Sequence, residues 1–78
     1  MARAKSSQHV ALGRALRELR EARGLSQEEL GFRSGLHRNY VGACERGEIN
    51  LSFESLLRLA EALTTRLSDL IDRYEELL

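Results

Sequence analysis

Hydrophobic residues recur at intervals of three and four along almost the whole chain, a spacing that places them on one face of a helix. The alternation of apolar and polar residues that marks a half-buried strand is absent from the sequence. The chain also lacks proline, which would interrupt a helix. We therefore predict an all-α fold, a compact five-helix bundle with short loops.

Glycine and serine residues divide this pattern into helices. The first predicted helix covers residues 8–22 and is ended by Gly24, since glycine readily adopts the left-handed backbone that follows a helix end. Ser26 and Glu29 have the spacing of a capping box, which predicts the start of the second helix. This second helix runs to about Ser34.

Three more helices complete the predicted bundle. Gly35 and Gly47 bound the third helix, which covers roughly residues 37–46. Ser52 and Ser68 are expected to cap the fourth and fifth helices with their hydroxyl groups.

The length of 78 residues allows one domain, so we predict a flexible N-terminal arm at residues 1–7 and a single domain at residues 8–78. A domain of this size buries a limited share of its surface and is marginally stable alone. Its one cysteine, Cys44, forms no intrachain disulfide, and two histidines without a second cysteine argue against a zinc site. We expect no metal and no cofactor, which leaves oligomerisation as the stabilising device.

Several classes of protein are disfavoured by composition. No stretch of about 18 apolar residues is present, so we expect no membrane span. The polar N-terminus does not resemble a secretory signal, and a free thiol without an export signal predicts a cytoplasmic protein. We also see no catalytic combination of serine, histidine and carboxylate residues, and we predict that the chain is not an enzyme and binds no small molecule.

The net charge is zero, but the charges are unevenly distributed. Residues 1–23 carry six basic and two acidic side chains, a net charge of +4, whereas residues 68–78 carry one basic and four acidic side chains, a net charge of −3. A basic end of this kind can face the phosphates of a nucleic acid. The same charges are equally compatible with solvated helix faces, and the charge pattern alone leaves both interpretations open.

The most informative stretch is residues 27–46, where two short helices meet across a tight turn. Gly31 is small where the second helix would face the third, and Gly35 lies in the turn, where a positive φ costs glycine little. Apolar residues are spaced to pack between the two helices and the rest of the bundle: Leu30, Leu36, Val41 and Cys44. This is the pattern of a helix-turn-helix whose second helix is free to enter a major groove.

Over about residues 10–71 the sequence resembles the lambda-repressor-like, Cro/repressor-type DNA-binding family, and within it the controller proteins of restriction–modification systems. The residues in register are Arg20, Gln27, Gly31, Gly35, Val41, Glu45 and Gly47. The resemblance implies a sequence-specific transcriptional regulator that binds double-stranded DNA as a homodimer on a palindromic operator. The alternative is an antitoxin, which would use the same fold to bind a protein, although only residues 1–7 are left to wrap a toxin.

The resemblance implies that the amino end of the third helix reads bases through His37, Arg38, Asn39 and Ala43. The planar guanidinium of Arg38 can pair with O6 and N7 of guanine, a contact worth about 1–3 kcal/mol of discrimination. His37 is a weaker cap than Asp, Ser or Thr, which would leave its imidazole to reach DNA. Ala43 can only touch a thymine methyl. The plainer alternatives are a solvated charge at Arg38 and a turn filler at His37.

Other family positions contact the DNA backbone and correspond here to Gln27, Tyr40, Arg46, Asn50 and Ser55. Gln27 lies at a helix N-terminus, where its side chain and free N–H groups can meet a phosphate together. Tyr40 could instead pack on the bundle surface. Arg20 and Glu45 match an internal salt bridge of the family, the alternative being two surface charges. Cys44 is interpreted as a core residue rather than a redox switch.

The last helix has an apolar face that we interpret as a homodimer interface, because exposed apolar patches usually mark interfaces. Its residues are Leu67, Leu70, Ile71, Tyr74, Leu77 and Leu78, with a contribution expected from residues 64–66. Two-fold symmetry would place two recognition helices roughly 34 Å apart, facing a palindrome. The alternative is that these residues complete the core of a monomer.

Overall fold

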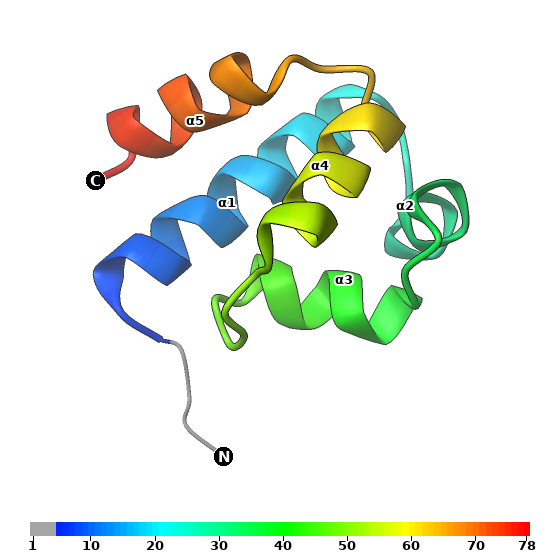
Figure 1. Cartoon of the computed structure of the whole chain (residues 1–78), viewed down its shortest axis with the longest axis horizontal. Coiled ribbons are helices and arrows are strands. Elements are labelled where there is room, and N and C mark those ends of the chain that lie inside the picture. The colour runs from blue at the N-terminus through cyan, green and yellow to red at the C-terminus, as the bar shows by residue number, and fades with distance from the viewer. Residues whose placement is uncertain (1–4) are drawn as a thin grey trace.

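Five helices account for most of the computed structural model, which describes residues 5–78 (Figure 1). They are α1 (Ser7–Ala22), α2 (Gln27–Ser34), α3 (Arg38–Glu45), α4 (Phe53–Ala62) and α5 (Leu67–Glu76). No strand occurs within the described part of the chain, so the predicted all-α fold is confirmed. Helix α1 contacts both α3 and α5, α2 packs against α3 and α4, and α4 also contacts α5.

Local capping interactions start most of these helices where the sequence predicted. The Ser26 hydroxyl accepts a hydrogen bond from the Glu29 N–H at 3.0 Å, and the Glu29 carboxylate accepts one from the Ser26 N–H at 2.9 Å. This is the predicted capping box, whereas Ser52 caps α4 through its hydroxyl alone, which accepts from the Ser55 N–H. Left-handed backbone at Gly24 and Gly35 follows α1 and α2, with φ angles of 71° and 75°.

Two predicted boundaries need adjustment. Ser6 caps α1 and Ser7 is its first residue, so this helix begins within the predicted arm, whose residues 1–4 lie outside the described part of the chain. The prediction that Ser68 caps α5 is wrong, because Arg66 holds the cap position and Ser68 is already helical. The Arg66 carbonyl accepts hydrogen bonds from the N–H groups of Asp69 and Leu70, so the backbone starts α5 without a side-chain cap.

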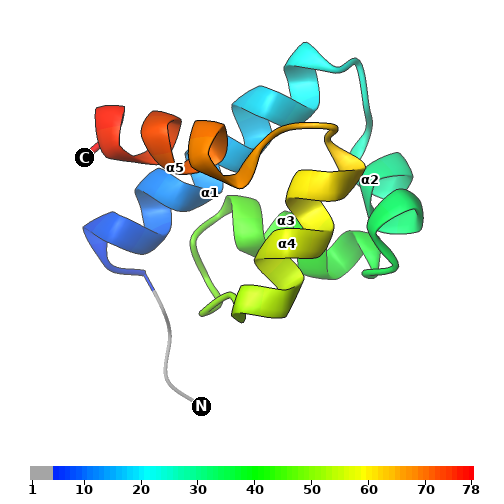
Figure 2. The same ribbon diagram turned by 45° about the horizontal axis from the view of Figure 1, so that its top comes forward.

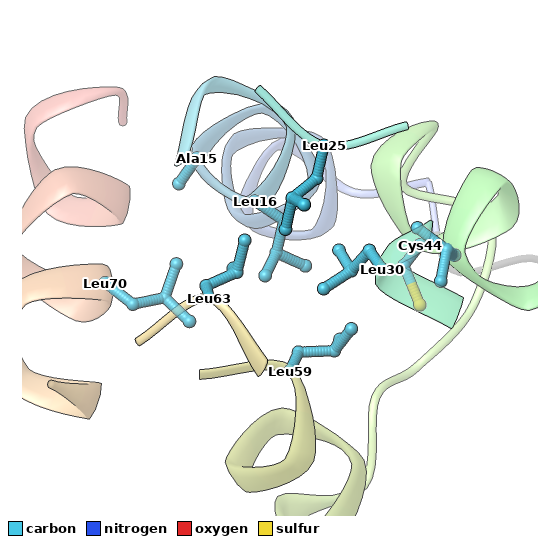
Figure 3. Close-up of a cluster of buried hydrophobic side chains, with 9 residues drawn as sticks. Ala15, Leu16, Leu25, Leu30, Cys44, Leu59, Leu63 and Leu70 are labelled. Atoms are coloured by element: carbon cyan, nitrogen blue, oxygen red, sulfur yellow. The ribbon is translucent and has the colours of Figure 1, made fainter. Parts of the chain in front are cut away.

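The core lies where the five helices meet. Each helix contributes at least one side chain that is essentially inaccessible to solvent: Leu16, Leu30, Val41, Leu59 and Leu70. Leu16, Leu30 and Leu59 converge from α1, α2 and α4, with Cys44 of α3 beside them (Figure 3). Burial raises the pKa of the Cys44 thiol to about 12, so the group stays a neutral core side chain, as predicted.

Glycine allows the backbones of the helix-turn-helix to approach one another closely. A Cβ atom at Gly31 would lie 2.7 Å from the Leu36 carbonyl oxygen and 2.9 Å from the Arg38 nitrogen. Only a residue without a side chain fits there, as the sequence predicted.

A second close approach fixes α3 against α1 and was not foreseen. A Cβ atom at Gly13 would lie 2.6 Å from the carbonyl oxygen of Glu45, at the end of α3. A glycine in the middle of an otherwise strongly helical segment was the available signal, because glycine weakens helices unless packing requires it. Together, the two contacts fix the start of α3 against α2 and its end against α1.

Candidate nucleic-acid interface

The amino end of α3 lies at the surface of the molecule. His37, Arg38 and Asn39 are all exposed, while Val41, Gly42 and Cys44 face inward. In both views α3 starts beside α2, on the side of the molecule away from the acidic carboxyl end of α5 (Figures 1 and 2). The predicted recognition residues are therefore accessible, and the acidic end of the chain does not cover them.

Arg38 is exposed but it is not without a partner. Its side chain is 58% accessible, and its Nη1 donates a hydrogen bond to Glu28 Oε2 of α2 at 2.7 Å. The sequence analysis did not single out Glu28, because the two residues are ten positions apart and belong to different helices. The guanidinium thus has a carboxylate partner on α2 in the unbound protein.

His37 caps α3, which corrects the expectation that its imidazole is left free. Its backbone is extended, with φ −75° and ψ 147°, and its Nδ1 accepts a hydrogen bond from the Asn39 N–H at 3.0 Å. This places the imidazole in the role that a serine or aspartate usually fills. Only the Nε2 side of the ring is left to meet DNA, and Ala43, one turn further along, is half-buried.

Arg20 and Glu45 form the internal salt bridge that the family resemblance implied. Arg20 Nε and Nη2 donate to the two carboxylate oxygens of Glu45 at 2.6 and 3.0 Å, and Arg20 Nη1 donates to the Leu25 carbonyl at 2.7 Å. The two side chains are only 11% and 4% accessible. The hydrogen bond with Glu45 raises the pKa of the Arg20 guanidinium, which favours its charged form.

The same carboxylate positions Gln27 at the start of α2. Gln27 Nε2 donates to Glu45 Oε1 at 3.0 Å. A Cβ atom at Gly42 would lie 3.3 Å from Gln27 Oε1 and 3.1 Å from Arg46 Nη1, so two predicted phosphate contacts meet over this glycine. Sequence analysis missed Gly42, although a glycine inside such a short helix was a signal for it.

Tyr40 and Ser55, two more predicted phosphate contacts, also lie side by side. The Tyr40 hydroxyl donates to Ser55 Oγ at 3.3 Å, and Ser52 Oγ donates to the same oxygen at 3.0 Å. In this arrangement the Ser55 oxygen is the acceptor in both bonds, which leaves its own O–H group to donate to an anion. Tyr40 also packs against the core, as the alternative interpretation of this residue expected, while its contact with a phosphate stays a prediction.

Arg46 and Asn50 are engaged within the protein. Arg46 donates from Nε and Nη2 to the two oxygens of Glu48 at 3.1 and 3.2 Å, and this pairing raises the pKa of Arg46. Asn50 Oδ1 lies 3.0 Å from His9 Nε2, a contact that sequence analysis missed because the two residues are 41 positions apart. Both predicted phosphate contacts therefore lie at the surface with a protein partner in place.

Comparison with known proteins places this geometry in a family. The model of the helix-turn-helix family matches residues 16–70, which include α2 and α3. The chain belongs to this helix-turn-helix family. Within that family the amino end of the second helix of the motif is the part that enters the major groove. In this helix-turn-helix protein the corresponding end of α3 begins at Arg38.

Individual relatives include proteins named as controllers. Control protein C.SmaI of Serratia marcescens is 44% identical over 62 residues, which cover 80% of this chain and 74% of that protein. Control protein C.BamHI of Bacillus amyloliquefaciens is 36% identical over 64 residues, covering 81% and 79%. The crystal structure of the restriction-modification controller protein C.AhdI from Aeromonas hydrophila superposes with a TM-score of 0.82 at 51% identity, covering 83% of this chain and 98% of that one.

The predicted dimer face of this helix-turn-helix protein is partly used inside the monomer. Leu70 is completely buried in the core, so its assignment to a dimer interface is wrong: its side chain fills the space that α1 and α4 leave beneath α5. Leu67, Tyr74 and Leu77 are half-buried and pack against the same core. The surface that remains includes Leu78, which is 63% accessible, and a half-buried Ile71.

A shallow hollow adjoins this surface, with a volume of about 140 Å³. It is lined by residues of α1, the α3–α4 loop and α5: Gln8, His9, Leu12, Asn50, Leu51, Ile71 and Tyr74. Its lining is partly apolar and partly polar, and it lies between the outer face of α5 and the loop that contains Asn50.

Within residues 5–78 no helix is long and apolar enough to cross a membrane.

Proposed function

We propose that this protein is a sequence-specific transcriptional regulator that binds a palindromic DNA operator as a homodimer, and that it acts as a controller protein of a restriction–modification system. The observation that carries the proposal is the amino end of α3, where the side chains of Arg38 and Asn39 are exposed to solvent. The relatives named as control proteins support the assignment to a regulator. Its place of action would be the cytoplasm, where the DNA lies.

The residues around α3 fit the two kinds of contact that such a regulator needs. Arg38, Asn39 and the Nε2 side of His37 are available to base edges, which carry the sequence information. Gln27 and Ser55 lie at the first turns of α2 and α4, where free N–H groups and hydroxyl donors suit phosphates. Arginine contacts to phosphates would make the affinity fall steeply with salt.

A dimer through the outer face of α5 would complete the site. Two-fold symmetry would turn the two α3 helices toward the same side of the duplex, roughly 34 Å apart, so that each reads one half of a palindrome. Ile71 and Leu78 supply apolar surface for this contact, and the shallow hollow beside Ile71 offers a place for a partner side chain.

Selection of bound sequences from random DNA tests the proposal directly. We expect a palindrome with half-sites one helical turn apart. Arg38→Ala should relax the preference at one guanine in each half-site and weaken discrimination there by about 1–3 kcal/mol. Arg17→Ala is the matched control, since Arg17 is a similarly exposed arginine in an ion pair with Glu21 on α1. Retention of the full base preference by Arg38→Ala would remove the readout role.

The antitoxin alternative is less well supported, because the relatives described above are control or controller proteins. It predicts copurification of a small toxic protein with this chain. We propose binding of DNA rather than catalysis as the activity of this protein.

A further inference from the structure

The ion pair between Glu28 and Arg38 connects the two helices of the motif. Glu28 is the second residue of α2 and Arg38 is the first residue of α3. The Glu28 carboxylate is 72% accessible and accepts from Arg38 Nη1 at 2.7 Å. A carboxylate beside a DNA-binding surface repels phosphates, so its position next to the main base-reading candidate needs an explanation.

The backbone on both sides of this ion pair is held in place. The capping box at Ser26 and Glu29 fixes the first turn of α2, and the close approach at Gly31 fixes the start of α3 against it. Glu28 and Arg38 therefore project from two elements whose relative position cannot change easily. An ion pair between such elements restricts the guanidinium more than a pair within one flexible segment would.

The hydrogen bond to Glu28 leaves Arg38 able to read a base. A guanidinium has five N–H donors, and this bond uses one of them. Among residues 5–78, no other protein atom accepts from the remaining four, and a bidentate contact with guanine needs only two. Glu28 can thus keep its hydrogen bond while Arg38 contacts O6 and N7 in the major groove.

The same carboxylate lowers the attraction of Arg38 to phosphates. An arginine whose charge is balanced by a neighbouring carboxylate releases fewer counterions from the DNA when it approaches the backbone. It therefore contributes less to sequence-independent binding. We infer that Glu28 is a specificity-determining residue: it orients Arg38 toward the base and weakens binding to DNA that lacks the matching guanine. This inference rests on the proposed function. It means that a residue of α2, as well as those of α3, contributes to recognition of the DNA sequence.

The test compares Glu28→Gln with Glu21→Gln. Glu21 is the matched control, because it is also an exposed glutamate paired with an arginine, at 3.2 Å from Arg17 on α1, and its loss changes the net charge equally. Dissociation constants are measured by fluorescence anisotropy for the selected operator and for a random duplex of equal length. Glu28→Gln should lower the ratio of the two affinities by about two- to fivefold for each half-site, whereas Glu21→Gln should leave it unchanged.

Two further measurements separate orientation from general charge. The salt dependence of random-duplex binding should become steeper in Glu28→Gln and stay closer to that of the wild type in Glu21→Gln. In an Arg38→Ala background, Glu28→Gln should no longer change the affinity ratio. An unchanged or raised ratio in Glu28→Gln alone would overturn the inference while leaving the proposed function intact. Failure of the wild-type protein to prefer any operator would instead overturn the proposed function.

Discussion

At the scale of single residues, Glu45 connects folding to the candidate interface. Its carboxylate accepts hydrogen bonds from Arg20, which ties α1 to α3, and from Gln27, which stands at the first turn of α2. Both of its oxygens accept hydrogen bonds within the protein, Oε1 from Arg20 and Gln27 and Oε2 from Arg20. A change at Glu45 should therefore affect both stability and the placement of Gln27.

Glu45→Ala should lower the free energy of unfolding by about 3–5 kcal/mol, because it leaves the buried guanidinium of Arg20 without its partner. Urea unfolding followed by circular dichroism measures this loss. Glu21→Ala is the control, as it breaks an exposed pair of the kind that contributes at most about 1 kcal/mol. Equal losses in the two variants would mean that burial of the Arg20–Glu45 pair contributes nothing to stability.

At the scale of elements, the helix-turn-helix depends on two backbones that touch. The atoms that would meet a Cβ at Gly31 belong to the main chain of Leu36 and Arg38, and main-chain atoms cannot move aside without displacing the start of α3. The atoms that would meet a Cβ at Gly42 are the far ends of Arg46 and Gln27, which can move. Gly31 and Gly42 therefore differ in how well they tolerate a side chain.

Gly31→Ala should destabilise the protein by about 1–3 kcal/mol through overpacking, even though alanine is the better helix former. Gly42→Ala should cost much less or stabilise the fold, because its neighbours are flexible side chains. Thermal unfolding of both variants measures the difference between them. If Gly31→Ala proved as stable as Gly42→Ala, the tight crossing of α2 and α3 would not be rigid.

Elements set by local chemistry were the ones that sequence predicted well. The capping box at Ser26 needs only neighbouring residues, and the left-handed turn at Gly35 needs only glycine. The start of α5 was missed because it depends on backbone bonds to the Arg66 carbonyl rather than on the nearby serine. The pairs of Glu28 with Arg38 and His9 with Asn50 join residues 10 and 41 positions apart, and only the packing of helices brings them together.

At the scale of the whole molecule, α5 has an inner face that is buried in the core and an outer face that is more accessible to solvent. Leu70 on the inner face completes the core, so removal of α5 would unfold the monomer and could not test dimerisation. Ile71, the next residue, is half-buried beside the shallow hollow and is absent from the cluster that packs on the core. A substitution at Ile71 can therefore probe self-association without emptying the core.

Ile71→Glu should raise the dimer dissociation constant by about tenfold or more, because a new carboxylate on each protomer would lose hydration within an apolar contact. Sedimentation equilibrium measures this change, and circular dichroism should show that the monomer stays helical. Phe32→Glu is the control: Phe32 is 89% accessible on α2, which both views place away from the carboxyl end of α5 (Figures 1 and 2). Ile71→Glu should also bind the full palindrome hardly better than a single half-site, since the second α3 would no longer be tethered to the first. A dimer that persists in Ile71→Glu but dissociates in Phe32→Glu would place the interface on α2 instead of α5. The two α3 helices would then be spaced differently from the half-sites of a palindrome that lie one helical turn apart.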